Sequence, residues 1–298
     1  ATPNSSASRE TGMKTLAMAT LAGALLLAGC QKKVRELPDA GEAVAGQGDD
    51  YDGSVDVTAI ETLADLPREI LVDDEYLKAE VTFDEGLFQK APAIAMDVVD
   101  SAQIRIEAML ADAKAYKEAD PDYFRPYVVR VQWNVVAEAG NVMSLEGFIY
   151  TFTGGAHGNY MTDARLYDSQ TGQPMRLSNF FLQPQATIRE HMNLVWQEIA
   201  EQKQRKAGGS GQLETFAAEA AELVNADSIL AGEVNFVPST VPGKFGGYVV
   251  HFAPYDIGAY AEGAYHITVP QSAFRDKLKP EYLNLFDGQP APVERMGD

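Results

Sequence analysis

The sequence contains a single cysteine, Cys30, among its 298 residues. An intrachain disulfide therefore cannot form, and a zinc site built from several cysteines is excluded. Basic residues are also few, because 24 Lys and Arg stand against 43 Asp and Glu and leave a net charge of −19. Such a charge repels nucleic acid phosphate and argues against a DNA- or RNA-binding role.

Long apolar runs are scarce as well. The longest apolar stretch near the N-terminus, Thr15 to Leu27, is shorter than the about 20 residues that a membrane-spanning helix needs. Hydrophobic residues nevertheless make up 46% of the chain and charged residues 22%. These proportions are those of a globular protein with a sizeable core, and they exclude a chain that is disordered throughout.

Cys30 ends a segment that has the features of a secretory signal peptide. A short basic start at Met13-Lys14 precedes the apolar stretch Thr15 to Leu27, and the run Leu-Ala-Gly-Cys follows. This run resembles the bacterial lipobox, in which the cysteine is acylated with diacylglycerol and becomes the mature N-terminus. We therefore assign residues 1–29 to an upstream segment and lipoprotein signal peptide, with Cys30 as the lipidation site, since two acyl chains anchor a protein stably.

The residues after Cys30 indicate which membrane holds the protein and how far the folded part can lie from that membrane. Resemblance to Gram-negative lipoproteins associates Asp at the next position with inner-membrane retention, but Gln31 stands there. We expect an outer-membrane lipoprotein facing the periplasm, with inner-membrane attachment as the alternative. Residues 30–56 are rich in Gly, Asp, Ala and Glu and predict a flexible tether with a reach of roughly 25 to 30 Å. Loss of the signal peptide removes two basic residues and one acidic residue, so the mature charge is −20.

Periodicity in the remaining chain predicts an α+β fold. Leu77, Ala79, Val81 and Phe83 alternate with polar residues, which is typical of a half-buried strand. Further strands are predicted at 127–135, 143–152, 160–167, 233–237, 247–253 and 264–269, and helices at 94–117, 186–206, 213–224 and 271–278. We expect two small subdomains, at 57–185 and 186–278, with antiparallel sheets and helices packed on one face, followed by a loose tail at 279–298.

Two segments differ from ordinary core. In the first, a strand from Tyr150 runs into three glycines around His157, which would expose backbone N–H groups and one imidazole to a ligand. The second places tyrosines on a Gly-rich loop after a strand, where they would suit recognition. The ordinary alternative for the first segment is a hairpin corner in which His157 caps the turn. For the second segment it is that the tyrosines pack over the strand ends. The candidate binding residues are Gly154, Gly155, Ala156, His157, Gly158, Asn159, Pro254, Tyr255, Asp256 and Tyr260.

Together these segments resemble the tandem extracytoplasmic module of RsiV-type anti-sigma factors, which also precedes the catalytic domain in PdaC-type peptidoglycan deacetylases. The resemblance covers roughly residues 70 to 278. The matching motifs are Gly-Gly-Ala-His at 154–157, Thr171-Gly172, the apolar segment Leu177 to Phe181, Pro-Tyr-Asp-Ile at 254–257, Tyr260-Ala261 to Gly263, and Val269-Pro270.

The resemblance implies a binding module rather than a catalyst. In RsiV-like proteins the module resembles a receptor for lysozyme, and in the deacetylases it accompanies an enzyme that acts on cell-wall glycan. This sequence shows neither a sigma-binding segment with a transmembrane helix nor a deacetylase domain after residue 278. We therefore expect a lipid-tethered module that binds a lysozyme-like muramidase, as a sensor, inhibitor or immunity factor. The acidic charge would steer it toward such basic enzymes.

Two other functions remain as alternatives. The first is recognition of peptidoglycan or another glycan, for which Tyr255 and Tyr260 would supply stacking surfaces. The second is a metal- or carboxylate-dependent hydrolase, in which His157, His251 and His266 would meet around a metal. The sequence has no His-Glu-x-x-His, Gly-x-Ser-x-Gly or P-loop motif. We therefore assign no catalytic residue, no metal site and no cofactor.

Overall fold

A computed structural model describes residues 66–295, which lie within one compact unit, Asp56–Asp298. The predicted signal peptide, the lipidation site at Cys30 and the tether lie outside the described residues. Within the described part of the chain, no helix combines the length and the apolar character needed to cross a membrane.

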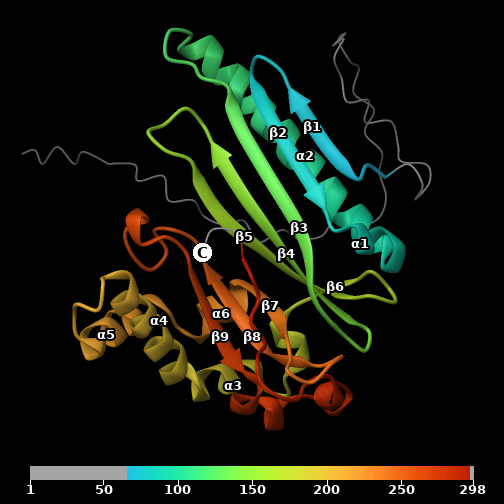
Figure 1. Ribbon diagram of the computed structural model, residues 1–298, viewed down its shortest axis with the longest axis vertical. Coiled ribbons are helices and arrows are strands. Elements are labelled where there is room, and N and C mark those ends of the chain that lie inside the picture. The colour runs from blue at the N-terminus through green and yellow to red at the C-terminus, as the bar shows by residue number, and fades with distance from the viewer. Residues whose placement is uncertain (1–65, 296–298) are drawn as a thin grey trace, which may run out of the picture. The chain divides into compact units, whose positions relative to one another are not determined.

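The first half forms a six-stranded sheet with the order β1-β2-β3-β4-β5-β6 (Figure 1). Its strands are β1 (Glu69–Asp73), β2 (Leu77–Phe83), β3 (Tyr127–Ala139), β4 (Val142–Phe152), β5 (Asn159–Asp168) and β6 (Pro174–Met175). All neighbouring strands are antiparallel except β2 and β3, which run parallel. A parallel pair needs a long crossover connection, and two helices between β2 and β3 provide it.

The crossover consists of α1 (Glu85–Lys90) and α2 (Pro92–Ala119). The Asp84 side chain accepts a hydrogen bond from the Gly86 N–H and so caps α1. Pro92 occupies the first turn of α2, where its missing N–H leaves no helical bond unmade. Helix α2 lies along one face of the sheet (Figure 1), and its apolar residues pack there against alternate residues of β2, β3 and β4.

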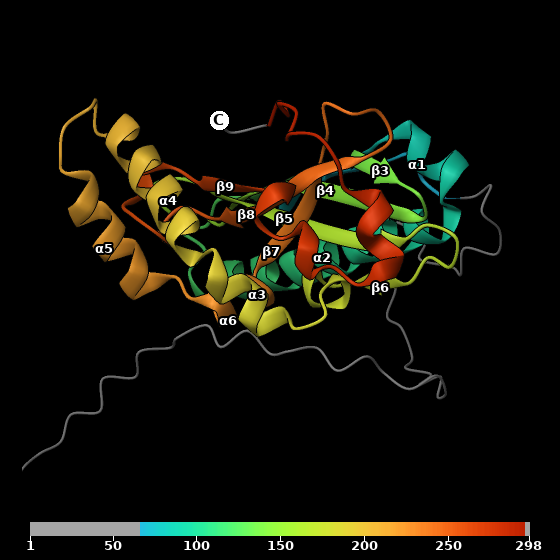
Figure 2. The ribbon, with the colours of Figure 1, turned by 90° about the horizontal axis from the view of Figure 1, so that it is seen from below.

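The second half forms a three-stranded antiparallel sheet with the order β7-β8-β9. The strands of this sheet are β7 (Glu233–Pro238), β8 (Phe245–Phe252) and β9 (Tyr265–Pro270). The helices of the second half are α3 (Pro184–Glu190), α4 (Met192–Lys206), α5 (Leu213–Leu223) and α6 (Ala226–Ala231). Helices α4 and α5 lie side by side (Figure 2), and α4 also packs against β9. The sequence predicts one helix over 186–206, but the structure divides it at His191, which has a non-helical backbone.

The two sheets share part of their cores. The face of the first sheet opposite α2 is covered at one end, where Ala137 and Leu166 join the core built by β7, β8 and β9. The other end of this face carries side chains that are exposed or half-buried, among them Arg130 and Tyr150. One end of the sheet face therefore serves the core and the other end remains open.

The predicted α+β class is confirmed, and the predicted helix at 94–117 and the strands correspond to observed elements. The expectation of a loose tail is corrected for residues 279–295. Residues Pro280–Leu285 form a 3-10 helix, and Phe286 is fully buried and bridges Phe245. Burial of the Phe286 ring stabilises this segment by about 1.5 to 3 kcal/mol. The prolines of the segment suggest a loose tail, because they give no sign of this buried ring.

Candidate functional site

The two segments singled out in the sequence meet in the structure. His157 lies in the turn between β4 and β5, and Tyr260 lies in the loop between β8 and β9. Their rings stack with centroids 3.9 Å apart and an interplanar angle of 26°. The Tyr260 hydroxyl also donates a hydrogen bond of 2.6 Å to the carbonyl oxygen of Gly158. One site therefore joins residues that are about a hundred positions apart in the chain.

Tyr255 is the most unusual residue of this site. Its backbone φ is 77°, and within residues 66–295 it is the one residue other than glycine with a positive φ. Pro254 precedes it, and the Asp256 carboxylate accepts a hydrogen bond of 2.8 Å from the Ala253 N–H. Proline followed by positive φ is typical of a type II turn, in which glycine is preferred at the second position. Holding tyrosine there costs about 1 to 2 kcal/mol.

This strained backbone places the Tyr255 ring in solvent. The residue is 62% exposed, yet its ring centroid lies 5.5 Å from that of Tyr260. We call His157, Tyr255 and Tyr260 the aromatic patch. Strain that persists at an exposed aromatic residue is typical of a functional surface, since a core residue would gain full packing energy in return, whereas Tyr255 remains largely in solvent.

Two lysines of α4 hold the loop that carries Tyr260. The Lys206 ammonium donates hydrogen bonds to the carbonyl oxygens of Glu262 and Ala264, at 2.7 and 3.0 Å. Lys203 lies 3.6 Å from the Glu262 carboxylate. Burial would raise the pKa of Glu262, but hydrogen bonds from Tyr265 and the Ala259 N–H, together with Lys203, hold it below its usual value. The loop is therefore fixed by an ionised carboxylate.

The glycines of the first segment have distinct roles. Gly154 has φ 88°, which favours glycine, and Gly158 is buried against Tyr150. A Cβ atom at Gly158 would lie 2.2 Å from the Tyr150 hydroxyl oxygen, so a side chain does not fit. Of the remaining candidates, Pro254 is buried and Tyr260 half-buried, whereas the exposed residues are Gly155, Ala156, His157, Asn159, Tyr255 and Asp256.

Two aromatic residues that the sequence analysis missed lie on the sheet next to the aromatic patch. Tyr160 of β5 lies with its ring 6.5 Å from Tyr260 and 5.8 Å from Phe148 of β4. Its hydroxyl accepts a hydrogen bond from the Ala264 N–H. The signal available in the sequence was the period-two spacing that places both residues on the open face of the sheet.

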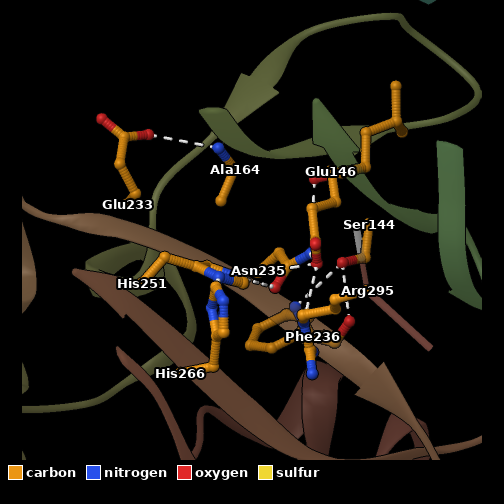
Figure 3. Close-up of polar contacts among 10 residues, drawn as sticks. Ser144, Glu146, Ala164, Glu233, Asn235, Phe236, His251, His266 and Arg295 are labelled. Atoms are coloured by element: carbon orange, nitrogen blue, oxygen red, sulfur yellow. Dashed lines mark hydrogen bonds and ion pairs between the residues drawn. The ribbon is translucent and has the colours of Figure 1, made fainter. Parts of the chain in front are cut away.

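The two histidines of the second sheet form a separate cluster between the sheets, in which His251 is buried and His266 half-buried (Figure 3). His251 of β8 and His266 of β9 are cross-strand partners, and their Nδ1 atoms are 2.7 Å apart. The His251 Nε2 atom lies 3.0 Å from the Asn235 amide oxygen and 3.7 Å from the Glu146 carboxylate. Because an amide oxygen only accepts, Nε2 carries the proton of a neutral His251 and its Nδ1 accepts from His266.

The buried carboxylate of this cluster is paired. Arg295 donates to Glu146 at 3.2 Å, and the Asn235 amide nitrogen lies 3.5 Å from the same oxygen. Burial lowers the pKa of His251 well below its ordinary value, and the neighbouring His266 and Arg295 charges lower it further. The cluster therefore links both sheets through a neutral histidine and an ion pair.

The structure does not assemble the three-histidine site considered from the sequence. His157 stacks on Tyr260 in the aromatic patch, whereas His251 and His266 belong to the buried cluster. Within residues 66–295, no group of three or more His, Cys, Asp or Glu residues is arranged to hold a metal ion. The chemistry that the aromatic patch offers is stacking and hydrogen bonding at a surface.

Comparisons with known proteins give the following matches. Residues 73–160 match the family model described as deacetylase PdaC. A member of the DUF3298 family from Bacteroides fragilis has a TM-score of 0.47 and 17% identity, covering 72% of this chain and 94% of that chain. A DUF3298 family protein from Pseudomonas aeruginosa has a TM-score of 0.43 and 19% identity, covering 76% and 100%. No curated protein matches the chain. The family match supports a PdaC-type domain over residues 73–160, which suggests an extracytoplasmic module associated with the cell envelope.

Proposed function

We propose that this chain is a binding module of the bacterial cell envelope and that it recognises a lysozyme-like muramidase through the aromatic patch. One observation carries the proposal. Two segments about a hundred residues apart meet at His157 and Tyr260 and leave Tyr255 exposed on a strained turn. The strain at Tyr255 lowers the stability of the fold, whereas a binding surface gains an aromatic anchor held in one conformation.

Aromatic side chains suit a protein partner. Tyrosine supplies a large contact area with only two side-chain dihedral angles to immobilise, so little conformational entropy is lost on binding. The His157 and Tyr260 rings are already stacked, and Tyr260 is fixed by its hydrogen bond to Gly158. The patch is therefore preorganised, which lowers the free-energy cost of association.

Charge supports a basic partner. The chain carries a net charge of −19, and a surface of that sign attracts basic proteins over distances set by the ionic strength. Muramidases are the basic proteins that the resemblance to RsiV-type modules suggests. Recognition would serve sensing, inhibition or immunity, and the site would be the same in each case.

Calorimetric titration of the purified protein with a basic lysozyme tests the proposal. We expect binding at low ionic strength that weakens as salt is added, and an at least tenfold loss of affinity for Tyr255→Ala, typical of an interface anchor. Tyr123→Ala is the matched control, because Tyr123 is 74% exposed on the connection between α2 and β3. Absence of lysozyme binding at low ionic strength would contradict the proposal.

We further propose that Cys30 carries the lipid that anchors the module, at the outer membrane and facing the periplasm. The support is the lipobox-like run before Cys30 and the Gln that follows it. Metabolic labelling with palmitate should mark the wild-type protein and not a Cys30→Ala variant. Separation of the inner and outer membranes then tests the proposed location, and recovery of the protein with the inner membrane would contradict attachment to the outer membrane.

A further inference from the structure

A groove crosses the open face of the six-stranded sheet, on the side opposite α2. It consists of three adjoining hollows with volumes of about 470, 240 and 410 Å³. The first two share Glu80 and Arg130, and the last two share Gln132 and Phe148, so the hollows are continuous. The floor of the middle hollow is formed by Glu80, Thr82, Arg130, Gln132, Phe148 and Tyr150.

The strand register explains why these side chains line one groove. Glu80, Arg130 and Tyr150 are partners in one row across β2, β3 and β4, and Thr82, Gln132 and Phe148 form the next row. Residues two apart on a strand point to the same face, so both rows face away from α2. Along β3 the groove extends from Val128 to Asn134, which corresponds to about 20 Å at 3.3 Å per residue.

Charges in this groove are paired within it. Glu80 lies 3.7 Å from Arg130, and Lys78 lies 2.7 Å from Asp73. In the third hollow Arg295 pairs with Glu146 at 3.2 Å, which leaves Glu294 at the far end as the remaining charge of the lining. In a chain with a net charge of −19, the middle of the groove is thus close to neutral. A basic protein or a phosphate polymer would find no complementary field there.

We propose that this groove binds an uncharged oligosaccharide. Phe148 and Tyr150 offer half-buried aromatic rings on which the apolar face of a sugar ring can pack. The Gln132 amide nitrogen donates a hydrogen bond of 3.4 Å to the Asn134 side-chain oxygen, which leaves its second N–H and its oxygen for sugar hydroxyl or N-acetyl groups. An elongated, neutral groove that combines apolar rings with a few polar groups fits a chain of sugar rings in shape, charge and hydrogen bonding.

A chitin oligosaccharide, which is an uncharged N-acetylglucosamine chain, is the probe for a calorimetric test with the full-length protein. We expect binding whose affinity is the same at low and high salt, since the ligand carries no charge. Tyr150→Ala and Gln132→Ala should each weaken it about tenfold, the loss expected for one aromatic or hydrogen-bonding contact. Tyr123→Ala, a matched change outside the groove, should bind as the wild type does.

The outcomes separate this groove from the aromatic patch. Tyr255→Ala should keep oligosaccharide binding even where it loses lysozyme binding, because Tyr255 does not line the groove. Thermal melts identify a variant that fails to fold, and Gln132→Ala, at a half-buried position on the open face, provides the second variant. The proposal is overturned if the wild type does not bind the oligosaccharide, if affinity falls with salt, or if Tyr255→Ala abolishes binding while folded Tyr150→Ala and Gln132→Ala retain it.

Discussion

Mild acid should destabilise this fold, because two buried histidines are neutral in the folded state. His191, between α3 and α4, contacts the Tyr248 hydroxyl through Nε2, and its Nδ1 has no hydrogen-bond partner among the described residues. Burial lowers the pKa of His191 to about 4, although Glu190 opposes the shift. Burial likewise lowers the pKa of His251, in the cluster between the sheets. Protonation of either ring would place a positive charge in a buried site, and at His251 the nearby Arg295 would oppose that charge although Glu146 lies 3.7 Å away.

The direction and size of the effect follow from proton linkage. An unfolded histidine has a pKa near 6.5, so between pH 6.5 and the folded-state value the unfolded chain binds more protons. Above about pH 6.5 these histidines are neutral in both states and do not lower the free energy of unfolding. Below that pH the free energy of unfolding falls as the pH decreases. For His191 the loss is about 3 kcal/mol between pH 6.5 and 4. Between pH 6 and 5, His191 contributes a slope of roughly 1 kcal/mol per pH unit. The lowered pKa of His251 acts in the same direction.

Urea unfolding followed by tryptophan fluorescence at a series of pH values measures this slope. The informative variant is His191→Gln, which keeps a polar group next to Tyr248 but does not titrate. We expect its slope between pH 6 and 5 to be smaller than that of the wild type by roughly 1 kcal/mol per pH unit, since every other titrating group is common to both proteins. Parallel lines for the two proteins across this interval would refute the assignment of a neutral, buried His191.

Three further changes test the packing. Tyr255→Gly should be more stable than Tyr255→Ala by about 1 kcal/mol, because both lose the ring but glycine accepts φ 77° without strain; equal urea midpoints would contradict this. Ser144→Ala should lower the free energy of unfolding by about 2 to 3 kcal/mol, since the Ser144 hydroxyl bonds both the N–H and the carbonyl of Phe236; a loss below about 1 kcal/mol would contradict it. Gly147→Ala should cost about 1 to 3 kcal/mol and change the fluorescence of Trp133, because the added Cβ would lie 2.9 Å from that ring; an unchanged spectrum and stability would argue against the close contact.

Elements with a clear period were predictable. Strand β2 alternates between apolar and polar residues, and α2 shows the apolar repeat of an amphipathic helix, so both could be located from the sequence. Strand β1 was missed because it is a five-residue edge strand without a regular alternation. The parallel pairing of β2 and β3 was also missed, since periodicity tells which face a residue occupies but not the direction of the neighbouring strand.

The candidate site was predictable as two parts but not as a whole. Glycines marked the turn at His157, and the Pro-Tyr pair marked the turn at Tyr255. The contact between His157 and Tyr260 depends on how two loops from different sheets approach, which spacing in the sequence does not encode. Glu146 was missed for a related reason, because an acid at an alternating strand position is expected to face solvent, whereas here the second sheet covers it.

The packed segment after residue 278 also bears on how the molecule can form during synthesis. Phe245 and Phe236 contact the Phe286 ring, and Arg295 reaches Glu146 on the first sheet. A chain that has emerged only as far as β9 holds all nine described strands but exposes the apolar socket for Phe286 and lacks Arg295, the partner of the buried Glu146 carboxylate. Such an intermediate is prone to aggregate, and it would benefit from a chaperone until the last ten of these residues arrive. Export across a membrane, which the proposed lipid anchor at Cys30 would require, brings the N-terminal sheet out first and would leave that socket as the last part of the core to be filled.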